Sequence, residues 1–235
     1  ISPDAFYAGQ KAGARSGTTQ PGPEEFMAVY SRLLQKSDDE VLSLHVSAAM
    51  SGTLNSAYIA AEQTDPGRVH LYDTRMAGLG LGFMVMEAVR LTERGMGIGD
   101  IVSALDDMRR KTRLYFLVGT MRYLVEGGRV GKAAGVAASL LQIKPILTVR
   151  DGIVDVYERP RTMRKALDRM WTIIDQAVVQ GIQSIGFQYT GNRTQVETMQ
   201  KEFTRKTGIS PVLAQLGPVI GCHTGPETMG IIIVG

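Results

Sequence analysis

The chain has 235 residues, of which 44% are hydrophobic and 21% are charged, a balance typical of folded globular proteins rather than disordered chains. Its net charge of +3 arises from 26 Lys and Arg interspersed with 23 Asp and Glu, so no basic stripe indicates nucleic-acid binding. A single cysteine, Cys222, excludes an internal disulfide framework and a Cys-based zinc site, and it fits a reducing cytoplasm. No apolar run reaches the roughly 18 residues of a membrane span.

The first predicted elements are two helices joined by a turn-rich segment. Ser2 is a typical N-cap, and Pro3 in the first turn loses nothing by lacking an N–H group. Residues 16–23 are rich in Gly, Pro and Thr, and residues 24–35 then place apolar side chains at helical spacing. We therefore expect Thr18 to lie just ahead of a helix N-terminus.

Strands and helices then alternate. Short apolar runs predict buried strands at 41–46 and 69–72, each followed by a predicted helix, at 54–63 and 77–95. This order favours a parallel sheet flanked by helices, in which ligands collect at the carboxyl ends of the strands. Those ends carry Ser47, Ser51 and Asp73.

The C-terminal half has a different pattern, with many short strands. Apolar stretches predict strands at 115–118, 145–149, 153–157, 185–189, 211–216 and 229–234. Helical spacing occurs at 121–126, 132–141, 162–179 and 194–206. Asp151-Gly152 predicts a hairpin turn, because both residues accept positive φ angles. We expect an α/β protein with an N-terminal α/β domain over 1–112 and a C-terminal α+β domain, mostly antiparallel, over 113–235.

Motifs for nucleotides and for serine hydrolysis are incomplete. Gly127 to Ala133 approaches a phosphate loop, but its glycine spacing is one residue short and Ala133 replaces the magnesium-binding hydroxyl. The glycines at 78–82 and 95–99 miss dinucleotide spacing and suit close helix packing. Neither Ser47 nor Ser51 has the flanking glycines of a nucleophile elbow.

The three histidines differ in their surroundings. His45 and His70 fall inside predicted strands and are interpreted as structural residues. His223 lies in a segment rich in Gly and Pro, 217–226, that we interpret as a loop from which the ring either packs or points into a pocket. Without a triad partner, a group of hydroxyls and a histidine suits holding an anion better than activating a nucleophile.

A carboxylate could be held by hydroxyls at predicted helix starts together with one cation. Thr18-Thr19 and Ser51-Gly52-Thr53 each precede or begin a predicted helix, and Arg129, bracketed by glycines, could supply charge. The alternative for each hydroxyl is that it only caps its helix.

Five dispersed motifs together resemble the DegV family in order and spacing. They are Thr18-Thr19-Gln20-Pro21, residues 47–57, residues 123–132, residues 143–152 and His223-Thr224-Gly225-Pro226. The resemblance implies a two-domain protein with a long-chain fatty acid, such as palmitate or stearate, buried between the domains, and no cofactor or metal. In bacteria that have a fatty acid kinase, it also implies a carrier without activity of its own, which presents the carboxylate to a separate ATP-binding subunit. We further expect the protein to be cytoplasmic and monomeric.

The same resemblance assigns the residues that contact the fatty acid. Carried over by position, they are Thr18, Thr19, Ser51, Gly52, Arg129 and His223. Two departures matter. Thr19 stands where the family usually has Ser, which adds a methyl group, and the family's first strand and Asp-Ser loop are expected ahead of Ile1 in a longer protein.

Two other functions remain open from the sequence. One is an acyl hydrolase or acyltransferase that uses Ser51 with His223, and the other is a regulatory module without a lipid. The 12 methionines suit an adaptable acyl tunnel, but they suit ordinary core packing equally well. A buried acyl chain would gain roughly 0.8 kcal/mol per CH₂ group, so the carboxylate contacts would mainly fix its orientation.

Overall fold

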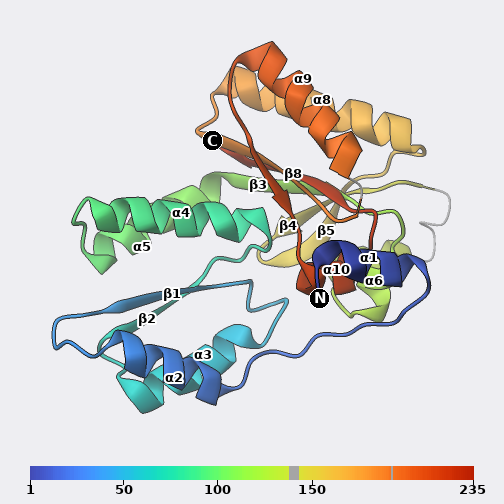
Figure 1. The fold of residues 1–235 in the computed structure, drawn as a ribbon. Coiled ribbons are helices and arrows are strands. Elements are labelled where there is room, and N and C mark those ends of the chain that lie inside the picture. The colour runs from blue at the N-terminus through green and yellow to red at the C-terminus, as the bar shows by residue number, and fades with distance from the viewer. Residues whose placement is uncertain (138–142, 192) are drawn as a thin grey trace. The chain divides into compact units, whose positions relative to one another are not determined.

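A six-stranded mixed sheet and a two-stranded parallel sheet organise the computed structural model, which describes residues 1–137, 143–191 and 193–235 (Figure 1). The chain divides into two units. The large unit contains Ile1–Thr18, Gly78–Gly80 and Lys111–Gly235, and the small unit contains Thr19–Ala77 and Leu81–Arg110. The expected α/β fold class, with a parallel sheet early in the chain and a mostly antiparallel sheet later, is confirmed.

The sheet of the large unit has the strand order β5-β4-β3-β8-β6-β7. Its strands are β3 (Thr112–Leu117), β4 (Ile146–Arg150), β5 (Ile153–Glu158), β6 (Ser184–Tyr189), β7 (Val212–Gln215) and β8 (Met229–Val234). Only the β6–β7 pair is parallel. Every residue of β8 is buried, as a central strand covered on both faces requires. At the β4–β5 turn, Asp151 and Gly152 have φ of 51° and 78°, which confirms the predicted hairpin.

Two long helices cover one face of this sheet, α8 (Met163–Gln180) and α9 (Arg193–Thr207) (Figure 1). Thr162 caps α8 by accepting a hydrogen bond from the Lys165 amide at 3.3 Å. The other helices are α1 (Pro3–Lys11), α6 (Arg122–Glu126), the 3-10 turn η1 (Gly131–Ala133), α7 (Ala134–Ala137) and α10 (Pro218–Thr224). The helix predicted over 132–141 is thus represented by η1 and α7, and its last residues lie outside the described ranges.

The small unit consists of two strands between two pairs of helices. Its elements are α2 (Pro23–Leu33), β1 (Val41–His45), α3 (Thr53–Thr64), β2 (Val69–Asp73), α4 (Leu79–Glu93) and α5 (Ile98–Lys111), with the ends of α4 and α5 reaching into large-unit segments. One apolar core joins the strands to α2 and α3, and another joins them to α4 and α5. Among the described residues, no helix combines the length and apolar character that crossing a membrane requires.

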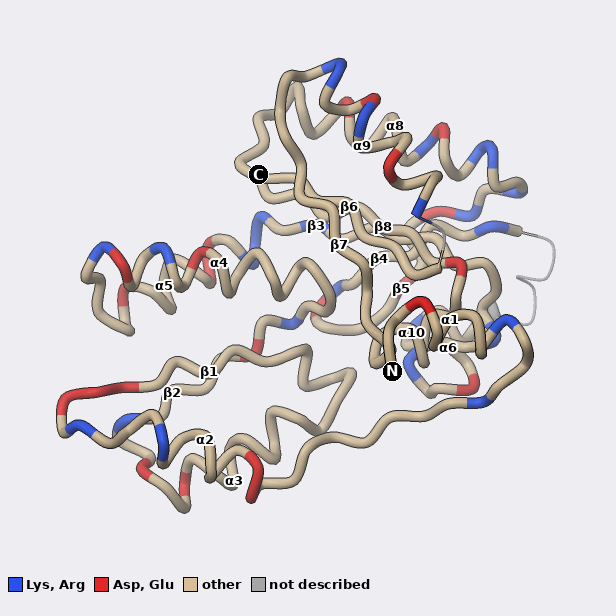
Figure 2. The backbone as a smooth tube through the Cα atoms, viewed as in Figure 1, with Lys and Arg blue, Asp and Glu red and all other residues tan. Residues whose placement is uncertain are grey.

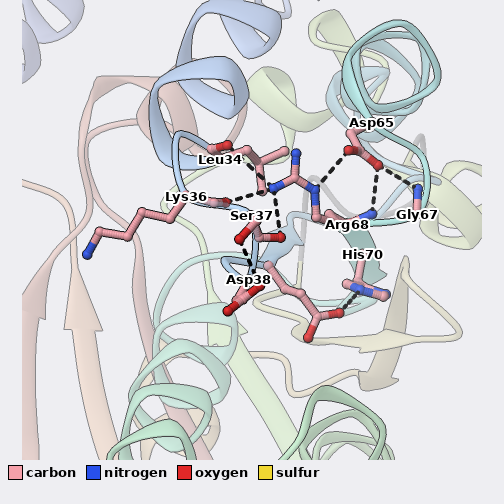
Figure 3. A network of polar contacts seen from close by, with 9 residues as sticks. Leu34, Lys36, Ser37, Asp38, Asp65, Gly67, Arg68 and His70 are labelled. Atoms are coloured by element: carbon pink, nitrogen blue, oxygen red, sulfur yellow. Dashed lines mark hydrogen bonds and ion pairs between the residues drawn. The ribbon is translucent and has the colours of Figure 1, made fainter.

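Arg68 fastens the strand β2 to the segment that follows α2 (Figure 3). Its Nε donates to Asp65 Oδ2 at 2.8 Å, and its Nη1 donates to the Lys36 carbonyl at 2.9 Å. The hydrogen bond from Arg68 is the main reason that the pKa of Asp65 lies below its ordinary value. His70 pairs with Glu40 at 2.9 Å nearby, in agreement with a structural role.

The first 18 residues belong to the large unit, which differs from the division expected at residue 112. The Tyr7 hydroxyl donates to the carbonyl oxygens of Leu216 and Gly217 at 2.6 and 3.1 Å. Gln10 Nε2 donates to the Gly221 carbonyl at 3.0 Å. Because these partners are more than 200 residues away in sequence, no local pattern predicts them.

Candidate functional site

His223 lies in the last turn of α10, which corrects the expectation that residues 217–226 form a loop. Gly217 takes the N-cap position and Pro218 the first turn, where proline favours helix formation. Gly225 ends the helix with φ of 83°, and a Cβ there would lie 2.3 Å from the Tyr123 ring. The Gly and Pro residues therefore mark the two ends of a short helix, and this helix carries the His223 imidazole.

The His223 ring contacts Thr18 through one nitrogen. Thr18 Oγ1 and His223 Nε2 lie 2.8 Å apart, which joins the end of the N-terminal segment to α10. The other nitrogen, Nδ1, is buried and has no hydrogen-bond partner among the described residues. A Cβ at Gly127 would lie 2.4 Å from Nδ1, so the absence of a side chain at this position leaves room beside the ring.

Arg129 places positive charge near this pair. Its Nη1 donates to the Gly127 carbonyl at 2.7 Å, and Gly127 adjoins the His223 ring. Burial first, and then the charge of Arg129, lower the pKa of His223 below its ordinary value of 6.5. The imidazole is therefore neutral near pH 7. If Nε2 carries the proton, it donates to Thr18, and the threonine hydroxyl proton is then available to an anion.

The other expected contact residues lie in the small unit. Ser51 Oγ is 2.7 Å from Thr53 Oγ1 and accepts from the Thr53 amide at 3.3 Å, at the start of α3. The N-cap of α3 is Gly52, so Ser51 lies one residue ahead of the cap position. A Cβ at Gly52 would lie 2.4 Å from Gln20 Oε1, so Gly52 allows this amide to approach the turn.

Thr18 and Thr19 do not cap the helix that follows them. The helix α2 begins at Pro23 with Gly22 as N-cap, and the Gly22 amide donates to Glu25 Oε2 at 2.9 Å. Thr19 is exposed, whereas Thr18 is half-buried against His223. The contact with His223 and the lower exposure favour Thr18 over Thr19 as the hydroxyl that holds an anion.

The structure thus brings together three of the expected residues, Thr18, Arg129 and His223, within the large unit. Thr19, Ser51 and Gly52 belong to the small unit. The role of all six as fatty-acid contacts, and the expected place of the ligand, stay predictions. Within the described ranges, no group of three or more His, Cys, Asp or Glu is arranged to hold a metal ion.

A cavity of about 410 Å³ adjoins α6 in the large unit. Its lining includes the apolar side chains of Val118, Met121 and Val125, together with Lys144, whose Nζ donates to the Gly119 carbonyl at 3.0 Å. This size lies within the range of small-molecule pockets. The lining also includes Thr120 and the charged side chains of Arg122 and Glu126, so the walls are mixed in polarity.

His45 belongs to a buried polar chain that the sequence analysis did not predict. Tyr30 donates to Ser43 Oγ at 2.9 Å, and Ser43 Oγ lies 2.8 Å from His45 Nε2. Residues 43 and 45 point to the same face of β1 because strand side chains alternate. The two-residue spacing of Ser43 and His45 is the sequence feature that could have predicted their contact. It does not predict Tyr30, the third member, which lies on α2.

The buried imidazole of His45 and the half-buried imidazole of His223 predict a pH dependence of stability. Burial is the largest cause that lowers the pKa of both His45 and His223 below 6.5. The unfolded chain therefore binds more protons than the folded chain, and the free energy of unfolding should fall as the pH drops below about 6.5. Urea unfolding at several pH values between 8 and 5 should show this fall.

Matched variants separate the two contributions to this pH dependence. The His45→Gln and His223→Gln variants should each show a shallower decrease than the wild type, whereas His70→Gln, which removes a half-exposed imidazole paired with Glu40, is the control. Equal slopes in all four proteins would contradict the assignment.

Comparisons with known proteins agree with the motif-based resemblance. The chain matches a family model described as "uncharacterised protein, DegV family" over residues 1–235. It is 32% identical over 218 residues to a DegV domain-containing protein of Streptomyces coelicolor, covering 92% of this chain and 77% of that protein. A DegV domain-containing protein of Staphylococcus aureus is 30% identical over 219 residues, with coverage of 92% and 78%.

Solved structures extend this likeness to the fold. A DegV family protein from Thermus thermophilus, described as fatty acid binding, matches with a TM-score of 0.89 and 36% identity. DegV from Bacillus subtilis, described as a fatty acid binding protein, matches with a TM-score of 0.89 and 29% identity. Each alignment covers 100% of this chain and 85% of the other.

Proposed function

Because this chain belongs to the DegV family, we propose that it binds a long-chain fatty acid whose carboxylate is held by Thr18, positioned by His223, near the charge of Arg129. The contact between Thr18 Oγ1 and His223 Nε2 is the observation that carries this assignment, since it couples a hydroxyl donor to a half-buried imidazole whose pKa is lowered. Related proteins described as fatty acid binding support the class of ligand.

Thr18 and His223 can bind an anion and compensate for the water that the anion loses on burial. A carboxylate accepts hydrogen bonds from hydroxyl and N–H groups, and those bonds are stronger than between neutral partners. A positive charge nearby supplies further stabilisation, which Arg129 provides without needing to lose its own bond to Gly127. Thr19, Ser51 and Gly52 are proposed as additional contacts, on the basis of the family resemblance.

Apolar walls would supply most of the affinity for the acyl chain. Burial contributes roughly 0.8 kcal/mol per CH₂ group, so a chain of about 16 carbons gains far more from its tail than from its carboxylate. The cavity beside α6 combines the apolar side chains of Val118, Met121 and Val125 with charged ones, so it does not by itself identify where the acyl chain binds. We propose palmitate and stearate as representative ligands.

A carrier is favoured over a Ser–His hydrolase. A hydrolase would need the Ser51 hydroxyl to be activated by His223. In the structure Ser51 Oγ contacts Thr53, and His223 Nε2 contacts Thr18, so each group has a different partner. We therefore propose that any phosphorylation of the bound acid belongs to a separate ATP-binding kinase subunit, which this chain serves as a cytoplasmic, monomeric carrier.

Lipid analysis of the purified protein tests the proposal. We expect native mass spectrometry to show a mass increase of one fatty acid, and extraction to identify a chain of about 16–18 carbons. Delipidated protein should bind palmitate with one-to-one stoichiometry. A delipidated, folded protein that binds neither palmitate nor stearate would contradict fatty-acid binding.

An ester-hydrolysis assay separates the carrier from the hydrolase. The wild type and a Ser51→Ala variant are each incubated with p-nitrophenyl palmitate. We expect the same background release of nitrophenol from both proteins. Turnover by the wild type that is lost in Ser51→Ala would replace the carrier with the hydrolase.

A further inference from the structure

The two ring nitrogens of His223 have different surroundings. Nε2 lies 2.8 Å from Thr18 Oγ1, whereas Nδ1 is buried and has no hydrogen-bond partner within the part of the chain that the structure describes. Gly127 adjoins the Nδ1 side of the ring, because a Cβ on this glycine would lie 2.4 Å from Nδ1 and 3.3 Å from Cε1. The proton of the neutral imidazole therefore has two unequal positions, one beside Thr18 and one beside Gly127.

The position of this proton decides what the Thr18 hydroxyl offers a ligand. With the proton on Nε2, the imidazole donates to Thr18 Oγ1, and the threonine proton is then available to an anion. With the proton on Nδ1, Thr18 has to donate to Nε2, so only its oxygen lone pairs are left for a ligand. Lone pairs repel a carboxylate and suit a protonated acid or another donor. The tautomer of His223 therefore selects the charge of the head group.

Hydrogen-bond counting does not choose between the two tautomers of His223, because Nδ1 lacks a partner among the described residues in either case. A proton on Nδ1 would be a buried donor without an acceptor, and a lone pair on Nδ1 is a buried acceptor without a donor. Both arrangements carry the same kind of desolvation cost. The choice then depends on the charge near Nδ1.

Arg129 brings positive charge to the Nδ1 side of the ring. Its Nη1 donates to the Gly127 carbonyl at 2.7 Å, which holds the guanidinium against the residue that adjoins Nδ1. A positive charge disfavours a nearby proton and favours a nearby lone pair. The same charge is, after burial, the second cause that lowers the pKa of His223. Both effects favour a neutral ring with its lone pair on Nδ1.

We propose that Arg129 is a positioning residue that holds the neutral His223 ring in the tautomer with its proton on Nε2. Gly127 belongs to this arrangement, since it accepts from the guanidinium and has no side chain to keep the ring away. Through the imidazole, Arg129 makes the Thr18 hydroxyl a donor to the ligand. The tautomer does not depend on any ligand, whereas the resulting preference for an ionised carboxylate rests on the proposed function.

The ¹⁵N shifts of the imidazole test the tautomer in delipidated protein. A ring nitrogen that carries a proton and one that carries a lone pair differ widely in ¹⁵N shift. The chain has three histidines, so the His223 signals are assigned by their absence from the spectrum of a His223→Gln variant. At a pH where the ring is neutral, we expect the wild type to carry the proton on Nε2. A wild-type ring with its proton on Nδ1 would overturn the proposal.

Substitutions of Arg129 separate its charge from its shape. Arg129→Gln should move the Nδ1 shift of His223 towards that of a protonated nitrogen and should raise the pKa of the ring, because a repelling charge is lost. Arg129→Lys keeps the charge and should keep the wild-type tautomer. Arg122→Gln is the matched control, since it removes an exposed arginine of α6 that lies 3.8 Å from Glu126.

The contrary result is a folded Arg129→Gln protein in which His223 keeps the wild-type tautomer and pKa, and it would overturn the proposal. Urea unfolding establishes that each variant is folded. Arg129→Met removes the same charge if Arg129→Gln does not fold.

Palmitate affinities test the consequence for the ligand. If Arg129 acts through His223 on Thr18, its replacement should matter less once the hydroxyl is gone. We expect Arg129→Gln to weaken palmitate binding about fivefold, the effect of one hydrogen bond, and less than about twofold in a Thr18→Val background. Equal losses in the two backgrounds would overturn the action through the ring. Wild-type protein that binds no palmitate would contradict the proposed function, whereas the tautomer measurement stands without it.

Discussion

Replacing His223 with Ala should lower the affinity for palmitate about 10- to 100-fold, because hydrogen bonds to charged groups contribute about 1.5–3 kcal/mol. The imidazole positions Thr18 Oγ1 at 2.8 Å, and without it the hydroxyl loses its fixed orientation. Thr18→Val, which keeps the shape but removes the hydroxyl, should weaken binding by a similar factor. Isothermal titration of delipidated proteins with palmitate measures both effects.

A double variant distinguishes a coupled pair from two separate contacts. If His223 acts through Thr18, the combined Thr18→Val and His223→Ala protein should bind palmitate about as weakly as either single variant. Additive losses would instead assign each side chain an independent contact with the carboxylate. His70→Ala is the matched control, since it removes a surface imidazole of the small unit that pairs with Glu40. Unchanged affinity in all variants would contradict the assignment of the site.

We expect the charge of Arg129 to contribute less to palmitate affinity than the hydroxyl of Thr18. Arg129 donates to the Gly127 carbonyl, and its contribution to an anion is electrostatic rather than a required hydrogen bond. Figure 2 shows how Lys and Arg alternate with Asp and Glu along the helices, so a general positive field does not replace a specific contact.

Elements with a strong local signal were predictable from the sequence. Ser2 accepts the amide hydrogen bond expected of an N-cap, and Asp151-Gly152 forms the expected turn. The basic run at 109–111 is interpreted from the sequence as the end of a helix, which α5 confirms, but the start of α5 was not predicted because the glycines at 95–99 suggested only close packing. Local patterns therefore fix most elements but not those that begin in glycine-rich sequence.

The residues of the candidate site could be named from the sequence, but the contacts between them could not be predicted. His223 was selected for its Gly- and Pro-rich surroundings, yet these residues form a helix because Pro218 and Gly217 occupy favourable positions at its start. The pairing of Thr18 with His223 spans 205 residues and has no signature in spacing. Long-range contacts of this kind depend on the packing of α1 against α10, which the sequence does not encode locally.

Replacing Tyr7 with Ala should destabilise the large unit by about 3–5 kcal/mol, the usual cost of removing a buried aromatic side chain. Tyr7 is 2% exposed, and a Cβ on Gly221 would lie 2.4 Å from its ring, so the ring lies directly against α10. Tyr7→Phe, which loses only the bonds to Leu216 and Gly217, should lose about 1–3 kcal/mol. Urea unfolding measures these losses, with exposed Tyr58→Ala as a control expected to change stability by less than about 0.5 kcal/mol.

The Tyr7→Ala variant also tests whether the N-terminal segment, residues 1–18, supports the proposed site. If α1 is anchored through Tyr7, its release also frees Thr18 from His223, so Tyr7→Ala should become sensitive to proteases within residues 8–18 and should bind palmitate more weakly. Tyr7→Phe, which keeps the ring, should resist cleavage better. A Tyr7→Ala protein with wild-type stability and unchanged protease resistance would show that residues 1–18 do not depend on this anchor.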